Sequence, residues 1–341
     1  MPEPRFLVVR LGSLGDILHT FPAVAALRES FPSAQIVWLT HPRWKFLVGT
    51  GELASDVWTV DTRILSSLRQ TISRLRQGSF TAAIDYQGLW KSAMVPFFAA
   101  VPRRIGFSSA TVREFGVPLL YTDRVNTTAT HIADQNGELS LRAGAKRATA
   151  PATVHIPAQD QSAICARLHA QGLERYVFFS PAGGWRSKCW PPERFGHLCR
   201  KLREALGLRC IVNAGPGDDD VAAAVVRASG DAAPIIHHGS LGELMALLRG
   251  AACAVAGDTG PLHLAATIGT PLVALFGPTD PARNGPYEGG RPRMRVQKSI
   301  VLRAPGVRTT HARGDHPHAS MLAITVDEVF DAVCRSMGVP K

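Results

Sequence analysis

Short runs of β-forming residues alternate with helical stretches along most of this chain of 341 residues. Parallel strands need long crossover connections, and the helices that supply them cover both faces of the sheet. The alternation therefore predicts the α/β class, with parallel sheets enclosed by helices. A helix is expected from about Asp16 to Ser30. Strands are expected near Phe6–Arg10, Gln35–Leu39, Ala82–Asp85, Tyr176–Ser180, Cys210–Ala214, Pro234–His237, Cys253–Gly257 and Leu272–Phe276.

A segment rich in Ala, Thr and Pro, about residues 145–160, divides the chain into two halves. The length is sufficient for two domains of ordinary size, which we expect over residues 1–155 and 156–341. A final helix, expected from about Val326 to Met337, is long enough to pack back on the first domain. Ligands of open α/β sheets bind outside the carboxyl ends of the strands, so two such domains facing across a cleft would bind ligands between them.

The chain carries 38 Lys and Arg residues against 27 Asp and Glu residues, a formal net charge of +11, and the excess is spread over both halves. This balance favours anionic partners such as sugar nucleotides, phosphorylated lipids or nucleic acid. Nucleic acid is the least favoured of these, because the basic residues are dispersed and no aromatic-rich binding motif accompanies them.

Cysteine usage and the N-terminal residues favour a cytoplasmic location. The six cysteines all lie beyond residue 160 and form no C-x-x-C pair, so neither a zinc site nor a disulfide framework is indicated. The first residues lack the charged, apolar and small-residue order of a signal peptide. The longest apolar run, Ser92 to Pro102, is too short to span a bilayer and is flanked by Lys91 and Arg103. We expect it to form a buried helix; the alternative is a patch that rests on an anionic membrane surface.

The segment Asp258-Thr259-Gly260-Pro261-Leu262-His263 stands between an expected strand and an expected helix. A turn of small residues leaves the first N–H groups of the helix unpaired, and Pro261 suits the first helical position. Such a helix start is a natural seat for phosphate, and His263 could add a hydrogen bond. We therefore expect a nucleotide diphosphate to bind here. The alternative is that Asp258 and Thr259 only cap the helix.

The turn Gly12-Ser13-Leu14-Gly15-Asp16 follows the first expected strand and opens a helix. It does not match the G-x-G-x-x-G fingerprint, and the second strand ends without an acidic residue for a ribose, which disfavours a nicotinamide enzyme. The Asp16 carboxylate could take a proton from an attacking hydroxyl group. Alternatively, it serves only the helix dipole. We expect His19, on the same helical face, to be a packed core histidine.

Two further loops carry charged residues that suit nucleotide chemistry. Lys188, in a strand-to-helix loop, could stabilise the negative charge of a phosphate as a bond breaks, although a lone lysine is more often solvated. After Gly215-Pro216-Gly217, one of Asp218, Asp219 and Asp220 could bind a ribose. We expect the other two to favour the helix start.

Taken together, several segments resemble the lipopolysaccharide heptosyltransferases of glycosyltransferase family 9, and most closely its type I branch. They occur in the family's order along nearly the whole chain. The matching segments are Val8–Ala23, Ile84–Ala93, Arg104–Phe107 with Arg113-Glu114, Lys188–Pro191, Gly257–Pro261 with His263, and Phe276–Thr279.

The resemblance implies a GT-B fold, with two Rossmann-like domains facing across a cleft. It also implies an inverting transfer of heptose from ADP-heptose to Kdo-lipid A in lipopolysaccharide inner-core biosynthesis. The first domain would bind the acceptor and the second the nucleotide sugar. The expected partners are thus an ADP-sugar and an anionic glycolipid. No metal or other cofactor is expected, and the implied location is cytoplasmic, with peripheral contact at the inner membrane left open.

By the same resemblance, Asp16 is expected to be the general base, and Lys188 the partner of the leaving phosphate. The residues implied in nucleotide binding are Asp258, Thr259, Gly260, His263 and Ser187. Those implied in acceptor binding are Ser13, Gly15, Gln87, Lys91 and Arg113. Arginines that could meet acceptor phosphates are Arg63, Arg69, Arg74, Arg76, Arg103, Arg104 and Arg113.

Three other functions remain open at this point. One is a GT-B glycosyltransferase with another nucleotide sugar or acceptor. Another is a GT-B-like sugar-nucleotide epimerase, which would turn over a donor without an acceptor. The third is a non-catalytic nucleotide- or glycolipid-binding protein, which the presence of both Asp16 and Lys188 disfavours.

Overall fold

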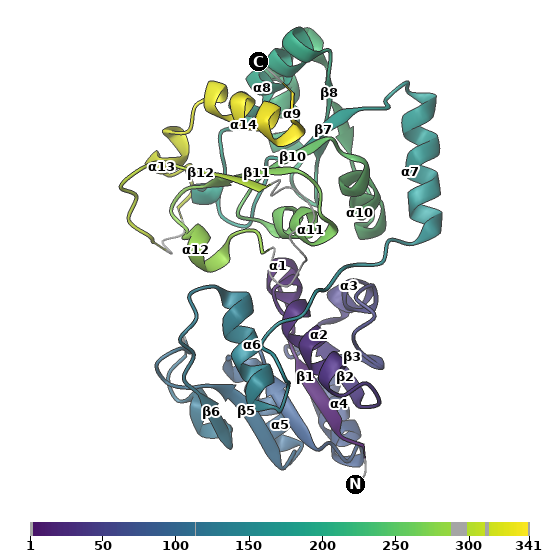
Figure 1. The fold of residues 1–341 in the computed structure, drawn as a ribbon, viewed down its shortest axis with the longest axis vertical. Coiled ribbons are helices and arrows are strands. Elements are labelled where there is room, and N and C mark those ends of the chain that lie inside the picture. Colours follow the sequence, from purple (N-terminus) through teal and green to yellow (C-terminus); the bar gives the residue numbers. More distant parts are fainter. Residues whose placement is uncertain (1–2, 113, 288–298, 311–313, 340–341) are drawn as a thin grey trace. The chain divides into compact units, whose positions relative to one another are not determined.

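The computed structural model describes residues 3–112, 114–287, 299–310 and 314–339. Arg113, expected to bind the acceptor, lies outside the described residues. The chain folds as two compact units, one formed by the described residues up to His155 and the other by those from Ile156 onward. In each unit a sheet lies between two groups of helices (Figure 1).

The first unit is built on a six-stranded parallel sheet with the order β3-β2-β1-β4-β5-β6. Its central strands are almost entirely apolar and buried, as is typical of a sheet covered on both faces. The strands are β1 (Arg5–Val9), β2 (Gln35–Thr40), β3 (Asp56–Thr59), β4 (Ala82–Asp85), β5 (Arg103–Phe107) and β6 (Asp123–Val125).

The helices of the first unit form two groups, in which α2 packs on α6 and α4 packs on α5. The α-helices are α1 (Leu14–Leu18), α2 (Phe21–Ser30), α3 (Lys45–Gly49), α4 (Leu65–Gln77), α5 (Trp90–Phe98) and α6 (Ile132–Arg142). Two short 3₁₀ helices are η1 (Pro42–Trp44) and η2 (Val117–Leu120).

The prediction of a single helix from Asp16 to Ser30 is wrong, because this segment forms two helices, α1 and α2. Pro22 lies in the first turn of α2 and has no N–H to donate to the carbonyl group of Leu18. The break leaves α1 only five residues long, so its orientation depends on contacts with the rest of the unit.

The second unit has a six-stranded parallel sheet with the order β12-β11-β10-β7-β8-β9. Numbered within the unit, this is the order 3-2-1-4-5-6 of the first unit, although the two halves show no sequence repeat. The predicted α/β class is therefore confirmed in both halves. The strands are β7 (Tyr176–Ser180), β8 (Arg209–Asn213), β9 (Ile235–His237), β10 (Cys253–Gly257), β11 (Leu272–Phe276) and β12 (Ser299–Arg303).

The helices of this unit also form two groups, one with α8, α9 and α14 and the other with α7, α10 and α11. The α-helices are α7 (Ala158–Ala170), α8 (Pro192–Leu206), α9 (Asp219–Ser229), α10 (Leu241–Gly250), α11 (Gly260–Ile268), α12 (Pro281–Asn284), α13 (Ala319–Leu322) and α14 (Val326–Met337). Two 3₁₀ helices are η3 (Arg186–Lys188) and η4 (Gly230–Ala232).

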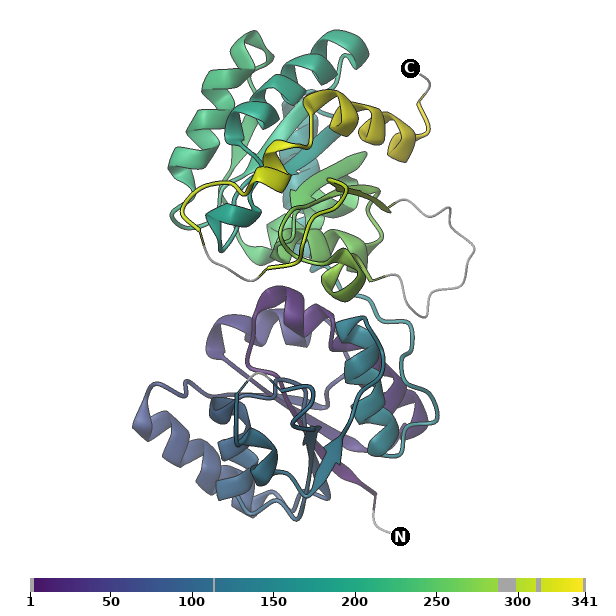
Figure 2. The same ribbon diagram turned by 90° about the vertical axis from the view of Figure 1, so that its left-hand side faces the viewer.

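The last helix belongs to the second unit and contributes to its core. Helix α14 packs on α8 and on strands β10, β11 and β12, as Figure 2 shows in yellow. Its apolar face, with Val329, Phe330 and Val333, completes the core of this unit. The helix has the length expected from the sequence, and its buried apolar residues pack in the core of the second unit.

All six cysteines lie in the second unit, and none of them is in a disulfide. Cys199, Cys210, Cys253 and Cys334 are buried, and burial raises the pKa of the Cys253 thiol to about 12. These thiols pack as small apolar side chains.

The apolar run from Ser92 to Pro102 is only half buried, which corrects the expectation of a buried helix. In α5, Ser92, Ala93, Val95 and Pro96 face the core, whereas the rings at the end of the helix are exposed. No helix in the described ranges is long and apolar enough to cross a membrane.

Candidate functional site

Both sheets have a point where the strand order reverses, between the first and fourth strands of each unit. Crossover connections leave these two strands in opposite directions, and the crevice outside their carboxyl ends is where doubly wound folds bind ligands. In the first unit this point lies at the ends of β1 and β4; in the second it lies at the ends of β7 and β10. The predicted site residues within the described ranges follow these four strands.

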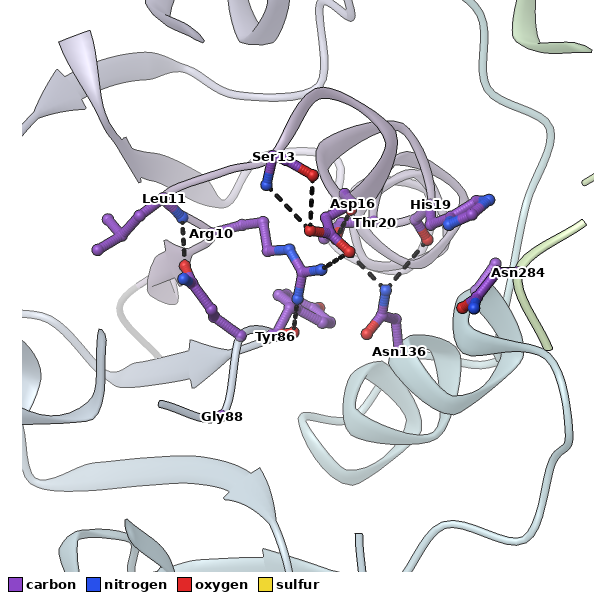
Figure 3. A network of polar contacts seen from close by, with 12 residues as sticks. Arg10, Leu11, Ser13, Asp16, His19, Thr20, Tyr86, Gly88, Asn136 and Asn284 are labelled. Carbon is purple, nitrogen blue, oxygen red and sulfur yellow. Dashed lines mark hydrogen bonds and ion pairs between the residues drawn. The ribbon is translucent and has the colours of Figure 1, made fainter. Parts of the chain in front are cut away.

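Asp16 lies in α1, just after the loop that leaves β1 (Figure 3). Its Oδ2 accepts hydrogen bonds from the backbone N and the Oγ of Ser13, at 3.0 and 2.9 Å. Its Oδ1 pairs with the guanidinium group of Arg10 at 2.7 Å. The side chain is nevertheless 45% exposed, so the carboxylate is fixed in direction but remains accessible to a ligand.

Arg10 is buried and links Asp16 to the neighbouring strand. Its Nη1 donates to the carbonyl group of Tyr86, directly after β4, while its Nη2 faces Asp16. A planar guanidinium group can serve two acceptors in fixed directions in this way. Arg10 therefore ties the carboxylate to both strands at the point where the order reverses.

The environment of Asp16 favours its ionised form. Desolvation raises the pKa of Asp16, but the Arg10 guanidinium and the hydrogen bonds from Ser13 outweigh it and hold the pKa at about 2. The carboxylate is thus charged throughout the neutral range. It can accept a hydrogen bond or a proton from a hydroxyl group, but the same contacts make it a weak base.

The loop after β4 is fixed by a second carboxylate, Asp85, which is fully buried. It accepts hydrogen bonds from Tyr121 Oη at 2.7 Å, Ser92 Oγ at 2.8 Å and the backbone N of Gln87 at 2.9 Å. Burial raises the pKa of Asp85, and these donors offset part of that increase. Gln87 Oε1 in turn accepts from the backbone N of Leu11 at 2.8 Å, so the loop after β4 is joined to the loop that carries Asp16.

Two buried side chains of α6 hold the segment that runs from the end of α1 into α2. Asn136 Nδ2 donates to the carbonyl oxygen of His19 at 3.1 Å, at the break between α1 and α2. Four residues on, Ser140 Oγ donates to the carbonyl oxygen of Ala23 at 2.8 Å. The first contact holds the junction at the end of α1, and the second holds α2 beside it.

The other predicted residues of the first unit are arranged as follows. Gly15 is buried within α1, and Lys91 is exposed in the first turn of α5. His19 is 4% exposed and meets the ring of His131 edge-on at 5.2 Å, which confirms the expected core position.

In the second unit, Lys188, Asp258 and His263 form one cluster. Lys188, at the end of η3 after β7, donates from Nζ to the carbonyl oxygen of Asp258 at 2.9 Å and to its Oδ2 at 3.1 Å. His263 Nε2 lies 3.3 Å from Oδ1 of the same carboxylate. The structure thus brings together three residues that are as much as 75 positions apart in the sequence.

Asp258 does not act as a helix cap, which decides one alternative left open by the sequence. The residue at the N-cap of α11 is Thr259, and its hydroxyl donates to the carbonyl oxygen of Gly257 rather than capping the helix. Burial raises the pKa of Asp258, but His263 and Lys188 outweigh it and hold this pKa well below its ordinary value. The carboxylate is ionised and holds both partners beside the start of α11.

The loop that carries Lys188 packs directly against β10. A Cβ atom on Gly183 would come within 2.8 Å of Thr259 Cγ2, so a side chain here would push the loop from the helix start. The ammonium group of Lys188 also lies 4.7 Å from the centre of the Trp185 ring, a favourable cation–π contact. Ser187 is buried, and its carbonyl oxygen accepts from the backbone N of His318.

The three aspartates after β8 have separate positions. Asp218 Oδ2 accepts from the backbone N of Gly215 at 3.1 Å and closes the turn. Asp219 and Asp220 lie in the first turn of α9, as expected of residues that favour a helix start.

Comparison with known proteins shows the family of this chain. The sequence matches glycosyltransferase family 9 (heptosyltransferase) over residues 68–299, which is more than half of the chain. The chain belongs to this family. It is therefore a glycosyltransferase, and the resemblance stated from the sequence motifs is confirmed.

Curated relatives and solved structures of the same family are similar over most of their length. Lipopolysaccharide heptosyltransferase 1 of Pseudomonas aeruginosa is 26% identical, with 83% of this chain and 81% of that protein covered. Lipopolysaccharide heptosyltransferase 3 of Escherichia coli is also 26% identical, with 78% and 80% covered. The structure of the E. coli heptosyltransferase WaaC with ADP superposes with a TM-score of 0.76 at 24% identity, with 97% and 99% covered.

Sequence reasoning missed several residues that shape the site of this glycosyltransferase. Arg10 and Asp85 stand in the matching segments, but their spacing alone gave them no role. A charged residue at the end of a buried strand was the available signal for both. Asn136 gave no signal, since it lies in an amphipathic helix 117 residues from the carbonyl group that it pairs.

Most of the arginines suggested for acceptor phosphates have partners within the first unit. Arg63, Arg74 and Arg103 pair with carboxylates. Arg76 and Arg104 donate to backbone carbonyl groups. Within the described part of this glycosyltransferase, no three His, Cys, Asp or Glu side chains are grouped closely enough to hold a metal ion.

Proposed function

We propose that this glycosyltransferase moves heptose from ADP-heptose to Kdo-lipid A with inversion at the anomeric carbon. Its curated relatives are named as lipopolysaccharide heptosyltransferases, and one related structure is described with ADP. The transfer needs two things of the protein: a seat for the diphosphate that leaves and a group that takes the proton of the acceptor hydroxyl.

The second unit supplies the diphosphate seat. The first-turn N–H groups of α11, at Thr259 and Gly260, have no acceptors within the helix and can donate to phosphate oxygens. Lys188 adds a positive charge beside them. Asp258 is negative and would repel a phosphate, so its role is to orient Lys188 and His263 rather than to contact the diphosphate.

The first unit supplies the base. As the acceptor oxygen attacks the anomeric carbon, the bond from that carbon to the phosphate oxygen breaks, and ADP leaves with the electron pair. The proton of the attacking hydroxyl passes to Asp16. Ser13 and Arg10 hold the carboxylate in direction, which reduces the reorganisation needed when the hydroxyl arrives.

The observation that carries this function is the cluster of Lys188, Asp258 and His263 at the start of α11 in a member of the family. The test is mass spectrometry of the products after incubation with ADP-heptose and Kdo-lipid A. We expect a gain of one heptose mass with the wild-type protein, and a rate about 10²-fold or more lower with Asp16→Ala.

The controls separate the alternative functions. Asp16→Asn keeps the size and hydrogen-bonding shape of the side chain and should lose the same activity if proton transfer is its role. Loss of donor in the absence of acceptor would indicate an epimerase or hydrolase. If the wild-type protein binds ADP but transfers no heptose, then the donor or the acceptor is a different sugar and the proposal is wrong.

A further inference from the structure

Helix α5 exposes an apolar stripe. Trp90, Phe97 and Phe98 are 41%, 39% and 50% exposed, and Met94 between them is half-buried. These positions are spaced by four, three and one residues, so they fall on one face of the helix, while the opposite face packs in the core. An apolar residue exposed singly is ordinary, but a stripe along one helix is not.

Neighbouring segments extend this stripe. Phe115 is almost fully exposed and lies beside Trp90, whose Nε1 donates to its carbonyl oxygen at 3.2 Å. Leu119, 71% exposed, lies in η2, which packs against α5. We call the surface formed by these side chains the α5 patch; it consists of Trp90, Met94, Phe97, Phe98, Phe115 and Leu119.

Positive charges surround the patch. The guanidinium group of Arg104 lies 5.4 Å from the centre of the Phe97 ring, and Arg76 donates to the carbonyl oxygen of Phe98. Arg124 donates to the carbonyl oxygen of Pro118, next to Leu119, and Lys91 is exposed beside Trp90. In the same set of contacts one carboxylate, that of Glu114, reaches the patch, where it accepts from the backbone N of Trp90.

Exposed aromatic side chains surrounded by Lys and Arg side chains suit the interfacial region of a lipid bilayer, between the anionic headgroups and the acyl chains. We propose that the α5 patch docks the first unit on an anionic lipid bilayer. The rings enter the interface, and Arg76, Arg104, Arg124 and Lys91 meet the phosphate groups of the lipids. The α5 patch does not include Asp16. It begins at Trp90, where the loop after β4 ends, whereas the contact with the Asp16 loop is made by Gln87, near the start of that loop.

The position of the patch gives the docking a use. Helix α5 begins three residues after Gln87, whose side chain is bonded to the loop that carries Asp16. A protein docked through α5 would therefore hold this loop near the headgroup level. Only this last step rests on the proposed function, since it matters only for an acceptor that is a lipid-anchored saccharide.

The test is co-sedimentation of the full-length protein with vesicles of phosphatidylcholine, with and without phosphatidylglycerol. We expect the wild-type protein to bind the anionic vesicles, and Phe97→Ser with Phe98→Ser to bind roughly tenfold or more weakly. Arg124→Glu, which leaves both rings in place, should weaken binding by roughly tenfold. The matched control is Leu141→Ser, an exposed apolar residue on α6 that is 43% exposed.

Several outcomes would overturn the docking. They are unchanged binding by the double variant, an equal loss in Leu141→Ser, and equal binding of the wild-type protein to neutral vesicles. A lipid-free dimer that the double variant converts to a monomer would assign the patch to a second copy of the chain instead.

A second readout separates this proposal from the proposed function. The double variant should transfer heptose to a delipidated acceptor saccharide at the wild-type rate, and should lose rate only with acceptor embedded in vesicles. If heptose transfer fails with every acceptor while vesicle binding still depends on the α5 patch, then the docking stands and the proposed function falls.

Discussion

Arg10 and Asp16 combine two requirements that oppose each other. A buried guanidinium group fixes the carboxylate and keeps it ionised, with a pKa of about 2. A base acts best when its pKa lies near the working pH, so the same ion pair lowers the driving force for proton transfer. In the proposed role of Asp16 as the base, these contacts favour orientation over basicity, as suits a step in which the hydroxyl becomes acidic only as it attacks.

The first prediction at this scale concerns Arg10→Met. Without the guanidinium charge, the pKa of Asp16 should rise toward or above its ordinary value of 3.8, because desolvation then acts with less opposition. The acid limb of kcat/KM against pH should move to higher pH by roughly one to two units. Arg10→Lys keeps the charge and should restore most of the wild-type profile. If the acid limb does not move in Arg10→Met, then Asp16 is not the group whose ionisation sets it.

The stability of the same variant tests the sign of this coupling. The pKa of Asp16 is lower in the folded protein than the ordinary 3.8, so the ion pair stabilises the fold above that pH. This contribution is lost as pH falls through about 2. The difference in unfolding free energy between the wild type and Arg10→Met should therefore become smaller as the pH falls from about 3.8 to about 2.

At the scale of single elements, α1 is too short to hold its own direction. Its C-terminal end is held by Asn136, which is fully buried and pairs the carbonyl group of His19. Thr20 adds a hydrogen bond to the carbonyl oxygen of Asp16 itself, at 2.9 Å. The loop that carries Asp16 is thus positioned by a different helix, α6, as much as by its own sequence.

We therefore expect Asn136→Ala to destabilise the protein by about 1–3 kcal/mol, because it removes the buried hydrogen bonds from Asn136 to the carbonyl oxygen of His19 and to Thr20 Oγ1. The rate of transfer should also fall, since α1 can then shift. The matched control is Gln135→Ala, whose side chain donates to Ala129 on a more accessible side of the same helix and should cost less. Urea unfolding and kcat measure the two effects, and equal losses in both variants would contradict this role.

The sequence predicted the buried elements well and the peripheral ones poorly. Strands such as β7, β10 and β11 are continuous apolar runs, which is the signal of a strand buried on both faces. By contrast, β3, β6 and β12 lie at sheet edges and are less buried, and neither these three strands nor β5, which begins with two arginines, is predicted from the sequence. The break between α1 and α2 was missed because the apolar spacing continues across Pro22.

The site follows the same division. Asp16, Lys188 and Asp258 each follow a strand, so the sequence could point to them. The ion pair of Lys188 with Asp258, and the support of Asp16 by Arg10, depend on which strands are neighbours in the sheets. Strand order is a property of the whole unit, and no local spacing reports it.

At the scale of the whole molecule, one topology is used twice for different chemistry. Both units have the strand order 3-2-1-4-5-6 and place their charged groups at the same reversal point. The first unit holds a carboxylate there, and the second holds a lysine beside a helix start. Each unit therefore contributes a separate half of the proposed reaction.

This division predicts where ADP protects the chain from hydrogen exchange. Protection should appear in residues 183–190 and 257–263, around Lys188 and the start of α11, and not in residues 10–16 around Asp16. Lys188→Met should weaken ADP binding by roughly 10- to 100-fold, because it removes a charged hydrogen-bond donor. Protection around Asp16 by ADP alone, or full affinity in Lys188→Met, would contradict the assignment.

The placement of the cysteines gives the two units different natural labels. Every thiol lies in the second unit, four of them buried, whereas Trp38, Trp44, Trp58 and Trp90 lie in the first. Pulsed alkylation of the buried thiols therefore reports the unfolding of the second unit. Tryptophan fluorescence reports mainly on the first unit. The order in which the two units unfold can therefore be measured from these two intrinsic signals, without adding a probe.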